Sequence, residues 1–350
     1  MNEVSLKNKR ILIIGGTNKV LQLASKKFLE KGCEKVTILS LHKDETLDLI
    51  KSPNIKIIYG DIHYLNSKEL SIAMMYNHYL VIASSKTTKR AIADENVDQY
   101  YFERNIEDTE NLLRIAKLCK IEKVLILGTH YCSMDRKYTH LKLAQRHPYI
   151  KNRQMQEDMA MSNATNKIQI MTLELPYILG RNFQMTGLFD LVALQIVANK
   201  PVPYFAGGGV FCTMEEAAQS IVNIFEVGES SKIYTLATMN LTWEQIIKEA
   251  KSYYGNKSAL VKFGTLKINK VMRKFKKEND KNNLKSGLNY KYYSKLLTCE
   301  EKFDTYAIST LLKLNTQADW KTEVHKTVDY VKEKYLEDLK LKRKKAKLFI

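Results

Sequence analysis

The sequence of 350 residues contains only five prolines, five cysteines and two tryptophans. So little proline excludes collagen-like and proline-rich disordered classes. The cysteines are odd in number, widely separated and without a CxxC pair, which argues against a disulfide framework and against a zinc site. The longest apolar stretch, residues 188–198, has about half the length that a membrane-spanning helix needs. These absences predict a cytoplasmic protein without a membrane span and without a bound metal.

Positive charge, in contrast, is abundant: 56 Lys and Arg residues stand against 38 Asp and Glu, for a net charge of +18. The segment from Lys251 to Cys299 carries 13 basic residues and two acidic ones, and a second basic cluster occupies residues 340–347. Such clusters suit an anionic partner, whether a phosphorylated small molecule, a nucleic acid or an acidic membrane surface. A solvated surface is the alternative explanation, because runs of charge often only contact water.

The first half of the sequence alternates short apolar runs with amphipathic segments of helical length. The predicted strands are residues 10–14, 35–39, 55–59, 79–83, 123–127 and 168–173. The predicted helices between them are residues 21–31, 43–51, 67–75 and 105–119. Strands that alternate with helices in this way form right-handed βαβ units. The expected fold is therefore α/β, a doubly wound parallel sheet of the Rossmann type with helices on both faces.

The alternation weakens after residue 175, which predicts a second, smaller lobe. We expect a Rossmann domain over residues 1–180, to which residues 212–240 return, a substrate lobe over 181–211 and 241–335, and a basic tail over 336–350. Thr242 and Gln245 have the spacing of a capping box and predict a helix over residues 242–254. The Asn- and Lys-rich residues 257–291 are expected to form a partly mobile segment. Two such lobes place a cleft at the carboxyl ends of the strands.

The loop after the first predicted strand contains the pair Gly15-Gly16 and leads into a helix, as a dinucleotide-binding turn does. Gly15 stands at the first glycine position of such a turn, while Asn18 and Leu21 occupy the other two. Asn18 is expected to replace its glycine by adopting a left-handed backbone, which asparagine tolerates better than most residues. Leu21 is expected to push the helix outward or to require different packing.

Further motifs follow in order along the chain. They are Gly60-Asp61 after the third strand, Ala83-Ser84-Ser85 after the fourth, Asn105-Ile106 in the long central helix, Val124–His130, Pro148–Arg153, Leu173–Arg181 and Phe303–Val328. With the glycine loop, this set resembles the extended and atypical short-chain dehydrogenase/reductases, the NAD-dependent epimerase/dehydratase group, over residues 9–332. The resemblance implies a dinucleotide cofactor, NADP or NAD. It implies cofactor contacts at Gly15, Gly16, Thr17, Asn18, Lys19, Val20, Ser40, Lys43, Asp61, Ile62, Ala83, Ser84, Pro176 and Tyr177.

The resemblance also implies catalytic residues. In this family a tyrosine transfers a proton at a carbinol or carbonyl, while nicotinamide carries the hydride. Tyr149 stands at the tyrosine position, and Arg153 replaces the lysine that assists it. Their i, i+4 spacing places both on one helix face, where the cation would lower the pKa of the phenol. The expected hydroxyl partner is Thr129, or His130 if the alignment shifts by one residue. A buried tyrosine beside a surface ion partner is the alternative.

Cofactor choice depends on the residues after the second strand. Ser40-Leu41-His42-Lys43 offers no acid for a ribose diol, so Ser40 and Lys43 slightly favour NADP and leave NAD open. The altered glycines and lysine indicate an outlying member of the family, with modified chemistry or none.

The leading hypothesis is an NAD(P)-dependent epimerase, dehydratase or reductase that acts on a carbinol or ketone. Its partner would be a small and anionic substrate, with a nucleotide sugar as one candidate, and a homodimer is one option for its assembly. The other hypothesis is a non-catalytic module of the same fold that binds a dinucleotide, RNA or a protein. Nucleic acid is the less favoured partner, because no RNA-binding motif is present.

Overall fold

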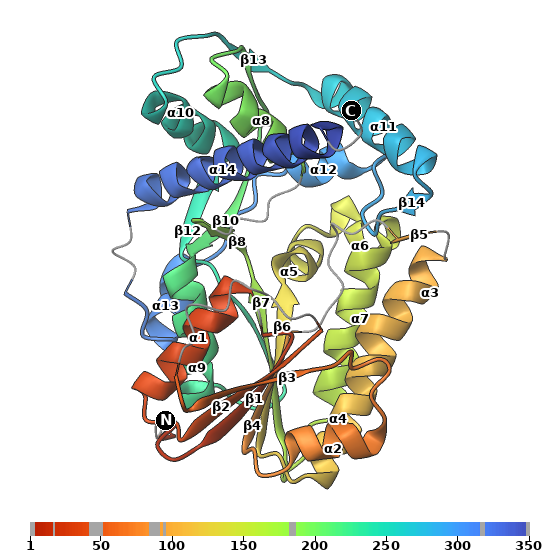
Figure 1. Ribbon diagram of the computed structural model, residues 1–350, viewed down its shortest axis with the longest axis vertical. Helices are drawn as coiled ribbons and strands as arrows, with labels where there is room; N and C mark the ends of the chain where they lie inside the picture. The colour runs from red at the N-terminus through yellow and green to blue at the C-terminus, as the bar shows by residue number, and fades with distance from the viewer. Residues whose placement is uncertain are drawn as a thin grey trace.

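A computed structural model describes residues 4–16, 18–41, 52–83, 92–93, 96–181, 187–315 and 319–347. Its centre is a seven-stranded sheet in the order β11-β7-β6-β4-β1-β2-β3, in which all neighbours are parallel (Figure 1). The strands are β1 (Arg10–Ile14), β2 (Lys35–Ser40), β3 (Ile55–Tyr59), β4 (Tyr79–Ile82), β6 (Lys123–Thr129), β7 (Gln169–Leu175) and β11 (Lys232–Thr235). The predicted doubly wound parallel sheet is confirmed.

Helices cover both faces of the sheet because its strands are apolar on both sides. On one face, Ile11 and Ile13 pack in one core with α1 (Lys19–Glu30) and α9 (Met214–Val227). On the other face, Leu12 and Ile14 pack with α2 (Ser67–Met74), α4 (Asp108–Leu118) and α7 (Pro148–Ser162). The segment that leads into α7 consists of α5 (His130–Lys137), a short turn and α6 (Leu143–Arg146).

A second lobe lies beyond the carboxyl ends of the strands (Figure 1). Its small sheets join β8 (Tyr177–Leu179), β10 (Gly208–Thr213) and β12 (Met239–Thr242), and β9 (Val202–Tyr204) with β13 (Leu260–Lys262). Its helices are α8 (Gly187–Val197), α10 (Trp243–Tyr253), α11 (Thr265–Lys281), α12 (Tyr293–Thr298) and α14 (Trp320–Lys347). The helix α13 (Thr305–Leu311) packs back against the core of α1 and α9 through Ile308. Trp243 is buried at the centre of the second lobe.

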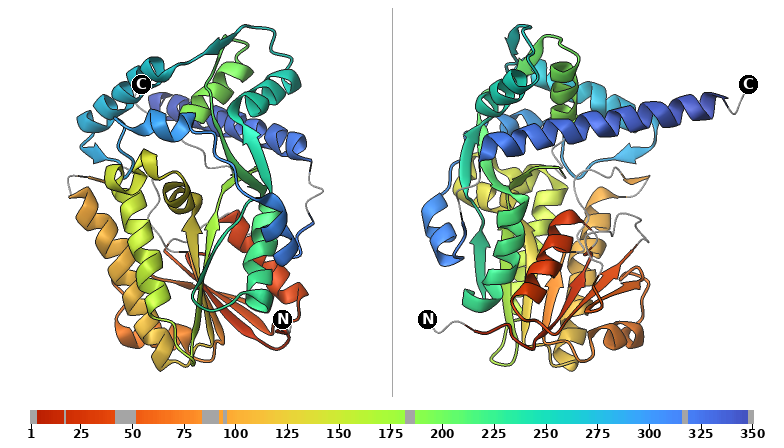
Figure 2. Two further views of the ribbon diagram at one scale, coloured as in Figure 1. Left: turned by 180° about the vertical axis from the view of Figure 1, so that it is seen from behind. Right: turned by 60° about the vertical axis from the view of Figure 1, so that its left-hand side comes forward.

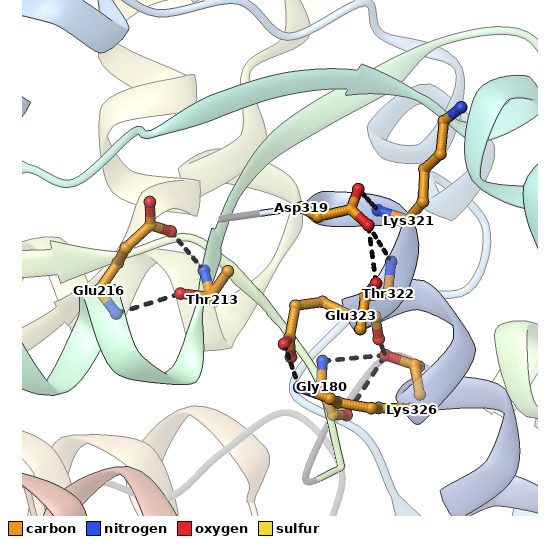
Figure 3. Close-up of polar contacts among 9 residues, drawn as sticks. Gly180, Thr213, Glu216, Asp319, Lys321, Thr322, Glu323 and Lys326 are labelled. Atoms are coloured by element: carbon orange, nitrogen blue, oxygen red, sulfur yellow. Dashed lines mark hydrogen bonds and ion pairs between the residues drawn. The ribbon is translucent and has the colours of Figure 1, made fainter. Parts of the chain in front are cut away.

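The predicted capping box is confirmed: the Thr242 hydroxyl accepts from the Gln245 N–H, and the Gln245 side chain accepts from the Thr242 N–H. Thr213 and Glu216 form a second capping box at the start of α9 (Figure 3). Both boxes satisfy backbone N–H groups that a helix cannot pair internally, so they fix where α9 and α10 begin.

The basic residues 257–291, which the sequence predicted to be partly mobile, contain regular secondary structure. They include the 17-residue helix α11, in which Ile268 and Met272 are buried at i, i+4 spacing while the lysines occupy the other faces. The prediction for this segment relied on its lysine and asparagine content, and composition does not reveal the helical spacing of the few apolar residues. A short strand, β14 (Leu284–Lys285), then pairs with β5 (Ile92–Ala93) of the first domain.

The last helix, α14, crosses the second lobe, and its carboxyl end projects beyond the body (Figure 2). At the end of β8 the Thr327 hydroxyl of α14 accepts from the Gly180 N–H at 2.9 Å. Figure 3 shows Gly180 beside Glu323 at the start of α14. Gly180 has φ +120°, and a Cβ there would lie 2.8 Å from a carboxylate oxygen of Glu323. Position 180 therefore needs glycine. Among the described residues, no helix is long and apolar enough to cross a membrane.

Candidate active site

The glycine turn lies at the carboxyl edge of the sheet, between the ends of β2 and β4. The Gly15 N–H donates to the Leu39 carbonyl at 2.8 Å, and the Ala83 N–H donates to the Ile14 carbonyl at 2.9 Å. Gly15 has φ +84°, a backbone conformation that favours glycine. A Cβ on Gly16 would lie 2.8 Å from Cγ2 of Ile38, so this position excludes a side chain.

Asn18 does not adopt the left-handed backbone that we expected. Its φ is −69°, and its side-chain oxygen accepts from the Leu21 N–H at 3.0 Å, so Asn18 caps α1. Leu21 is fully buried in the core that α1 shares with α9. The helix therefore accommodates a leucine at the third glycine position by burying its side chain in the core. Asn18 stabilises the start of α1 with its side-chain carboxamide and does not use a left-handed backbone.

The other predicted cofactor residues that the structure describes also lie at strand ends or at the start of α1. Val20, Ser40 and Pro176 are buried, Ile62 and Ala83 are half-buried, and Thr17, Lys43 and Ser84 lie outside the described residues. The Lys19 ammonium group lies 5.8 Å from the ring centre of Tyr330 on α14. The Asp61 carboxylate accepts from the His63 N–H and lies 3.6 Å from Arg104.

These features fit a dinucleotide. The left-handed Gly15 and the bare Gly16 let the backbone turn tightly at the start of α1. A helix that begins at such a turn presents its N–H groups and the positive end of its dipole, which together bind a pyrophosphate. The residues that could hold the pyrophosphate are therefore Gly15, Gly16, Asn18 and Lys19.

Tyr149 and Thr129 meet at the same edge of the sheet. Thr129 is the last residue of β6, and Tyr149 is the second residue of α7. The Thr129 hydroxyl lies close enough to the phenol to lower the pKa of Tyr149. Burial has the larger effect, however, so the pKa of Tyr149 is raised overall. The structure thus brings together the predicted phenol and the predicted hydroxyl.

Arg153 lies one turn further along α7, and its side chain is buried. Its guanidinium donates to the Leu127 carbonyl and to the Gln156 side chain. The positive charge of Arg153 lowers the pKa of Tyr149, in the expected direction, but burial of the phenol outweighs it. Arg153 is therefore near enough to act on Tyr149 by its charge, while its hydrogen bonds hold β6 to α7.

His130 follows Thr129 and faces a buried carboxyl group from a distant part of the chain. Its Nδ1 lies 3.3 Å from the Leu175 carbonyl, so Nδ1 carries the proton, and its Nε2 lies 3.7 Å from Oε2 of Glu301. Burial lowers the pKa of His130 to about 4 and raises the pKa of Glu301 to about 8. Both groups are therefore uncharged near pH 7. Beside them, the hydroxyls of Tyr131 and Tyr177 lie 3.0 Å apart.

A second set of buried ionisable side chains lies between α5, α7 and β7. Arg136 on α5 donates to Glu157 on α7 at 3.2 Å and also to Glu174 on β7. Both carboxylates are completely buried, and the Cys132 sulfur lies within 4.8 Å of one oxygen of each. Three such ligand atoms resemble a metal site, but Arg136 already bonds to both acids, and burial together with Glu174 raises the pKa of Glu157 to about 8.

Sequence reasoning missed Glu301, Arg136, Glu157 and Glu174. Glu157 lies one helical turn beyond Arg153, so a scan of the same helix face was the one signal available for it. Nothing local marked Glu301, which reaches His130 from 171 residues further along the chain.

Comparisons with known proteins identify the family and the fold. Residues 11–237 match the model of a family described as the NAD dependent epimerase/dehydratase family. A UDP-glucose 4-epimerase of Rickettsia bellii (strain OSU 85-389) is 23% identical over 268 residues, which are 74% of each chain.

Solved structures with the same fold cover nearly the whole chain. A UDP-glucuronic acid 4-epimerase from Bacillus cereus, in complex with UDP-glucuronic acid and NAD, has a TM-score of 0.66 at 15% identity and covers 93% of this chain and 99% of its own. The Bordetella bronchiseptica enzyme WbmF, in complex with NADH, has a TM-score of 0.65 at 14% identity and covers 97% and 96%. At these identities the likeness concerns the fold.

Proposed function

The chain belongs to the NAD-dependent epimerase/dehydratase family, and from this premise we propose that it epimerises or oxidises a secondary alcohol of a nucleotide sugar. It is thus an enzyme of the NAD-dependent epimerase or oxidoreductase class, as the family hypothesis expected. One observation carries the proposal: the Tyr149 phenol and the Thr129 hydroxyl meet at the carboxyl edge of a dinucleotide-binding sheet. NAD, when bound, supplies the hydride transfer.

Three residues of this chain move or hold the proton in this proposal. Tyr149 accepts the hydroxyl proton of the substrate as the carbinol carbon loses its hydride, and returns the proton in the reverse direction. Thr129 donates a hydrogen bond to the phenolate, and the Arg153 charge lowers the pKa of the phenol. Burial raises the same pKa by more than these two contributions lower it, so Thr129 and Arg153 reduce the cost of removing the phenol proton without bringing the pKa of Tyr149 below its ordinary value.

NAD is the cofactor of this family, so the slight preference for NADP that we drew from the sequence is set aside. Ser40, one of the two residues behind that preference, is buried at the end of β2 and offers little surface to a 2′-phosphate. We propose that Gly15, Gly16, Asn18, Lys19 and the ends of β3 and β4 hold the dinucleotide.

The nucleotide-sugar substrate is proposed from the relatives, which include a UDP-glucose 4-epimerase and a structure that holds UDP-glucuronic acid. A diphosphate would suit the basic second lobe, where the candidate contacts are Lys262, Lys267, Lys270, Arg273 and Lys274. A homodimer and a cytoplasmic location stay predictions.

Two measurements test this function. In a thermal-shift screen with NAD, NADH, NADP and NADPH, a ligand at a hundred times its dissociation constant adds about 2.7 kcal/mol of stability. We expect NAD to stabilise the unaltered protein. This stabilisation should be lost in Gly15→Val, because a valine backbone is strained at the φ of +84° that Gly15 adopts. Gly264→Ala is the matched control, since no atom lies within 4 Å of the added methyl group.

Turnover is then followed with UDP-glucose and UDP-glucuronic acid as substrates and NAD as cofactor. Tyr149→Phe should lower turnover by roughly 10²-fold or more, the usual scale of general acid–base catalysis, and leave NAD binding unchanged. If no dinucleotide stabilises the protein, or if Tyr149→Phe turns over as fast as the unaltered protein, the proposal is wrong.

A further inference from the structure

A short segment of the second lobe, Leu284–Asn289, crosses to the start of α7, and we name it the 284–289 strap. Its first two residues form β14, which pairs antiparallel with β5, so that Leu284 lies opposite Ala93 and Lys285 opposite Ile92. Figure 1 shows β14 beside β5, above α3 (Val97–Tyr101). Leu288 in the middle of the strap is buried. The strap is therefore packed onto the first domain and is not a surface loop.

The backbone of Gly287 contacts both Tyr149 and Tyr101, whose rings pack against each other. The Gly287 carbonyl accepts from the Tyr149 N–H at 3.0 Å, and the Gly287 N–H donates to the Tyr101 hydroxyl. As the second residue of α7, Tyr149 has an N–H that no carbonyl of its own helix can reach. Gly287 supplies the missing acceptor from another lobe.

Glycine is required at position 287 by sterics. A Cβ there would lie 2.4 Å from Cε2 of Tyr101 and 2.6 Å from its hydroxyl oxygen, and real Cβ atoms do not approach so closely. The Tyr101 ring fills this space and meets the Tyr149 ring edge-on, with centroids 5.7 Å apart. Two contacts thus orient Tyr149, one on its backbone and one on its ring.

His147 makes a third contact with the strap. Its Nδ1 accepts from the Asn289 N–H at 2.9 Å, so its proton sits on Nε2. Burial and the nearby Arg146 lower the pKa of His147 to about 4, which keeps the ring neutral. His147 immediately precedes α7 and is completely buried. The strap is therefore hydrogen-bonded to the two residues that flank Pro148.

We propose that the 284–289 strap positions Tyr149 for proton transfer, with Gly287 as its main positioning residue. This inference rests on the proposed function, since it assigns a role in the same reaction. Through the strap, the substrate lobe would fix the position of the Tyr149 phenol. No side chain of the strap has to touch the substrate for this. Misplacement of a reacting group by about 1 Å can lower turnover 10²-fold.

The first test is Gly287→Ala, assayed with UDP-glucose, UDP-glucuronic acid and NAD. The added methyl group displaces Tyr101 and with it Tyr149, so we expect turnover to fall roughly tenfold or more. KM and the affinity for NAD should stay within about twofold, because the dinucleotide loop lies at β1 and not at α7. Gly264→Ala, at the other end of the same basic segment, should match the unaltered protein in every measurement.

Two further variants keep the test informative if Gly287→Ala does not fold. Tyr101→Phe keeps the ring against Tyr149 and removes the hydroxyl that accepts from Gly287, so turnover should fall by several-fold at unchanged KM. His147→Asn retains an acceptor for the Asn289 N–H, whereas His147→Leu does not. Turnover should therefore survive better in His147→Asn than in His147→Leu.

The outcomes separate this inference from the proposed function. A protein without turnover on either UDP-sugar, or without NAD binding, overturns both, since a positioning role requires the reaction. An active protein in which Gly287→Ala and Tyr101→Phe keep full turnover overturns the role of the strap alone. A parallel loss of turnover and NAD affinity in Gly287→Ala would show that the substitution disturbs the whole fold and not Tyr149 alone. This result too would overturn the positioning role.

Discussion

Two buried polar clusters flank the end of β6, and they differ in whether an arginine bonds to their buried carboxyl groups. The charged cluster consists of Arg136, Arg153, Glu157 and Glu174, and in it Arg136 bonds to both carboxylates. The neutral cluster consists of His130, Tyr131, Tyr177 and Glu301. In this cluster Nε2 of His130 and Oε1 of Glu301 have no hydrogen-bond partner among the described residues.

The difference shows which cluster is structural and which is available for chemistry. In the charged cluster Arg136 bonds to both carboxyl groups, and burial together with Glu174 raises the pKa of Glu157 to about 8. Removal of Arg136 leaves two buried acids without their shared partner. In the neutral cluster burial keeps an acid and a base uncharged, 3.7 Å apart and close to Tyr149. Ionisable groups with shifted pKa values are typical of functional sites. We therefore expect changes in the charged cluster to affect stability most, and changes in the neutral cluster to affect pH dependence.

The largest effect should come from Arg136→Met, which leaves Glu157 and Glu174 buried without their shared partner. Loss of one partner from a buried ion pair costs about 3–5 kcal/mol. Because the Arg136 side chain is 43% exposed, we expect the lower end, about 3 kcal/mol, in the free energy of unfolding measured by urea at pH 7.

Arg181→Met is the matched control. Arg181 pairs with Glu333 at 2.5 Å, but both side chains are more than half exposed, so its loss should cost less than about 1 kcal/mol. The double variant Arg136→Met with Glu157→Gln should recover part of the lost stability, because it removes one of the two buried acids that have lost their partner. Equal losses for Arg136→Met and Arg181→Met would contradict the structural role of the charged cluster.

The second effect concerns Glu301 and pH. Burial raises the pKa of Glu301 to about 8, above its unfolded value, so the folded state binds a proton that the unfolded state has already lost. The stability that this proton contributes is complete below the unfolded pKa and is lost as pH rises through the folded pKa. The free energy of unfolding should therefore fall between about pH 5 and pH 8, by at most about 1.4 kcal/mol per pH unit.

Glu301→Gln cannot ionise, so its unfolding free energy should fall less steeply over the same range. Urea denaturation at several pH values measures both slopes. Glu300→Gln is the control, because the neighbouring Glu300 side chain is 57% exposed. If the slope is the same with and without the Glu301 carboxyl group, burial does not raise the pKa of Glu301, and the contrast between the two clusters is lost.

The sequence predicted the fold far better than these clusters. Alternating runs such as 10–14 and 35–39 reveal parallel strands because apolar strands and amphipathic helices have local periods. Tyr149 and Thr129 were found through a resemblance between ordered motifs. Contacts such as His130 to Glu301 or Tyr149 to Gly287 join residues more than 100 positions apart, and no local pattern marks either partner. Spacing placed Arg153 on the helix face of Tyr149, but spacing could not reveal that Arg153 is buried and bonded to Leu127.

Arg153 belongs to the charged cluster and also acts on Tyr149, so its variants separate charge from hydrogen bonding. Its positive charge lowers the pKa of the phenol, and Arg153→Ala should therefore move the rising limb of the activity–pH profile to higher pH. Arg153→Lys keeps the charge and loses the bidentate fork, so it should keep the profile near its original position and lose stability instead. The measurement is turnover against pH for the three proteins with the same UDP-sugar, beside their urea denaturation curves.

This is the smallest expected effect, because burial outweighs the Arg153 charge in setting the pKa of Tyr149. Identical profiles for Arg153→Ala and the unaltered protein would leave Arg153 with a structural role alone, inside the charged cluster, and would leave Thr129 as the one described group that favours the phenolate by a hydrogen bond.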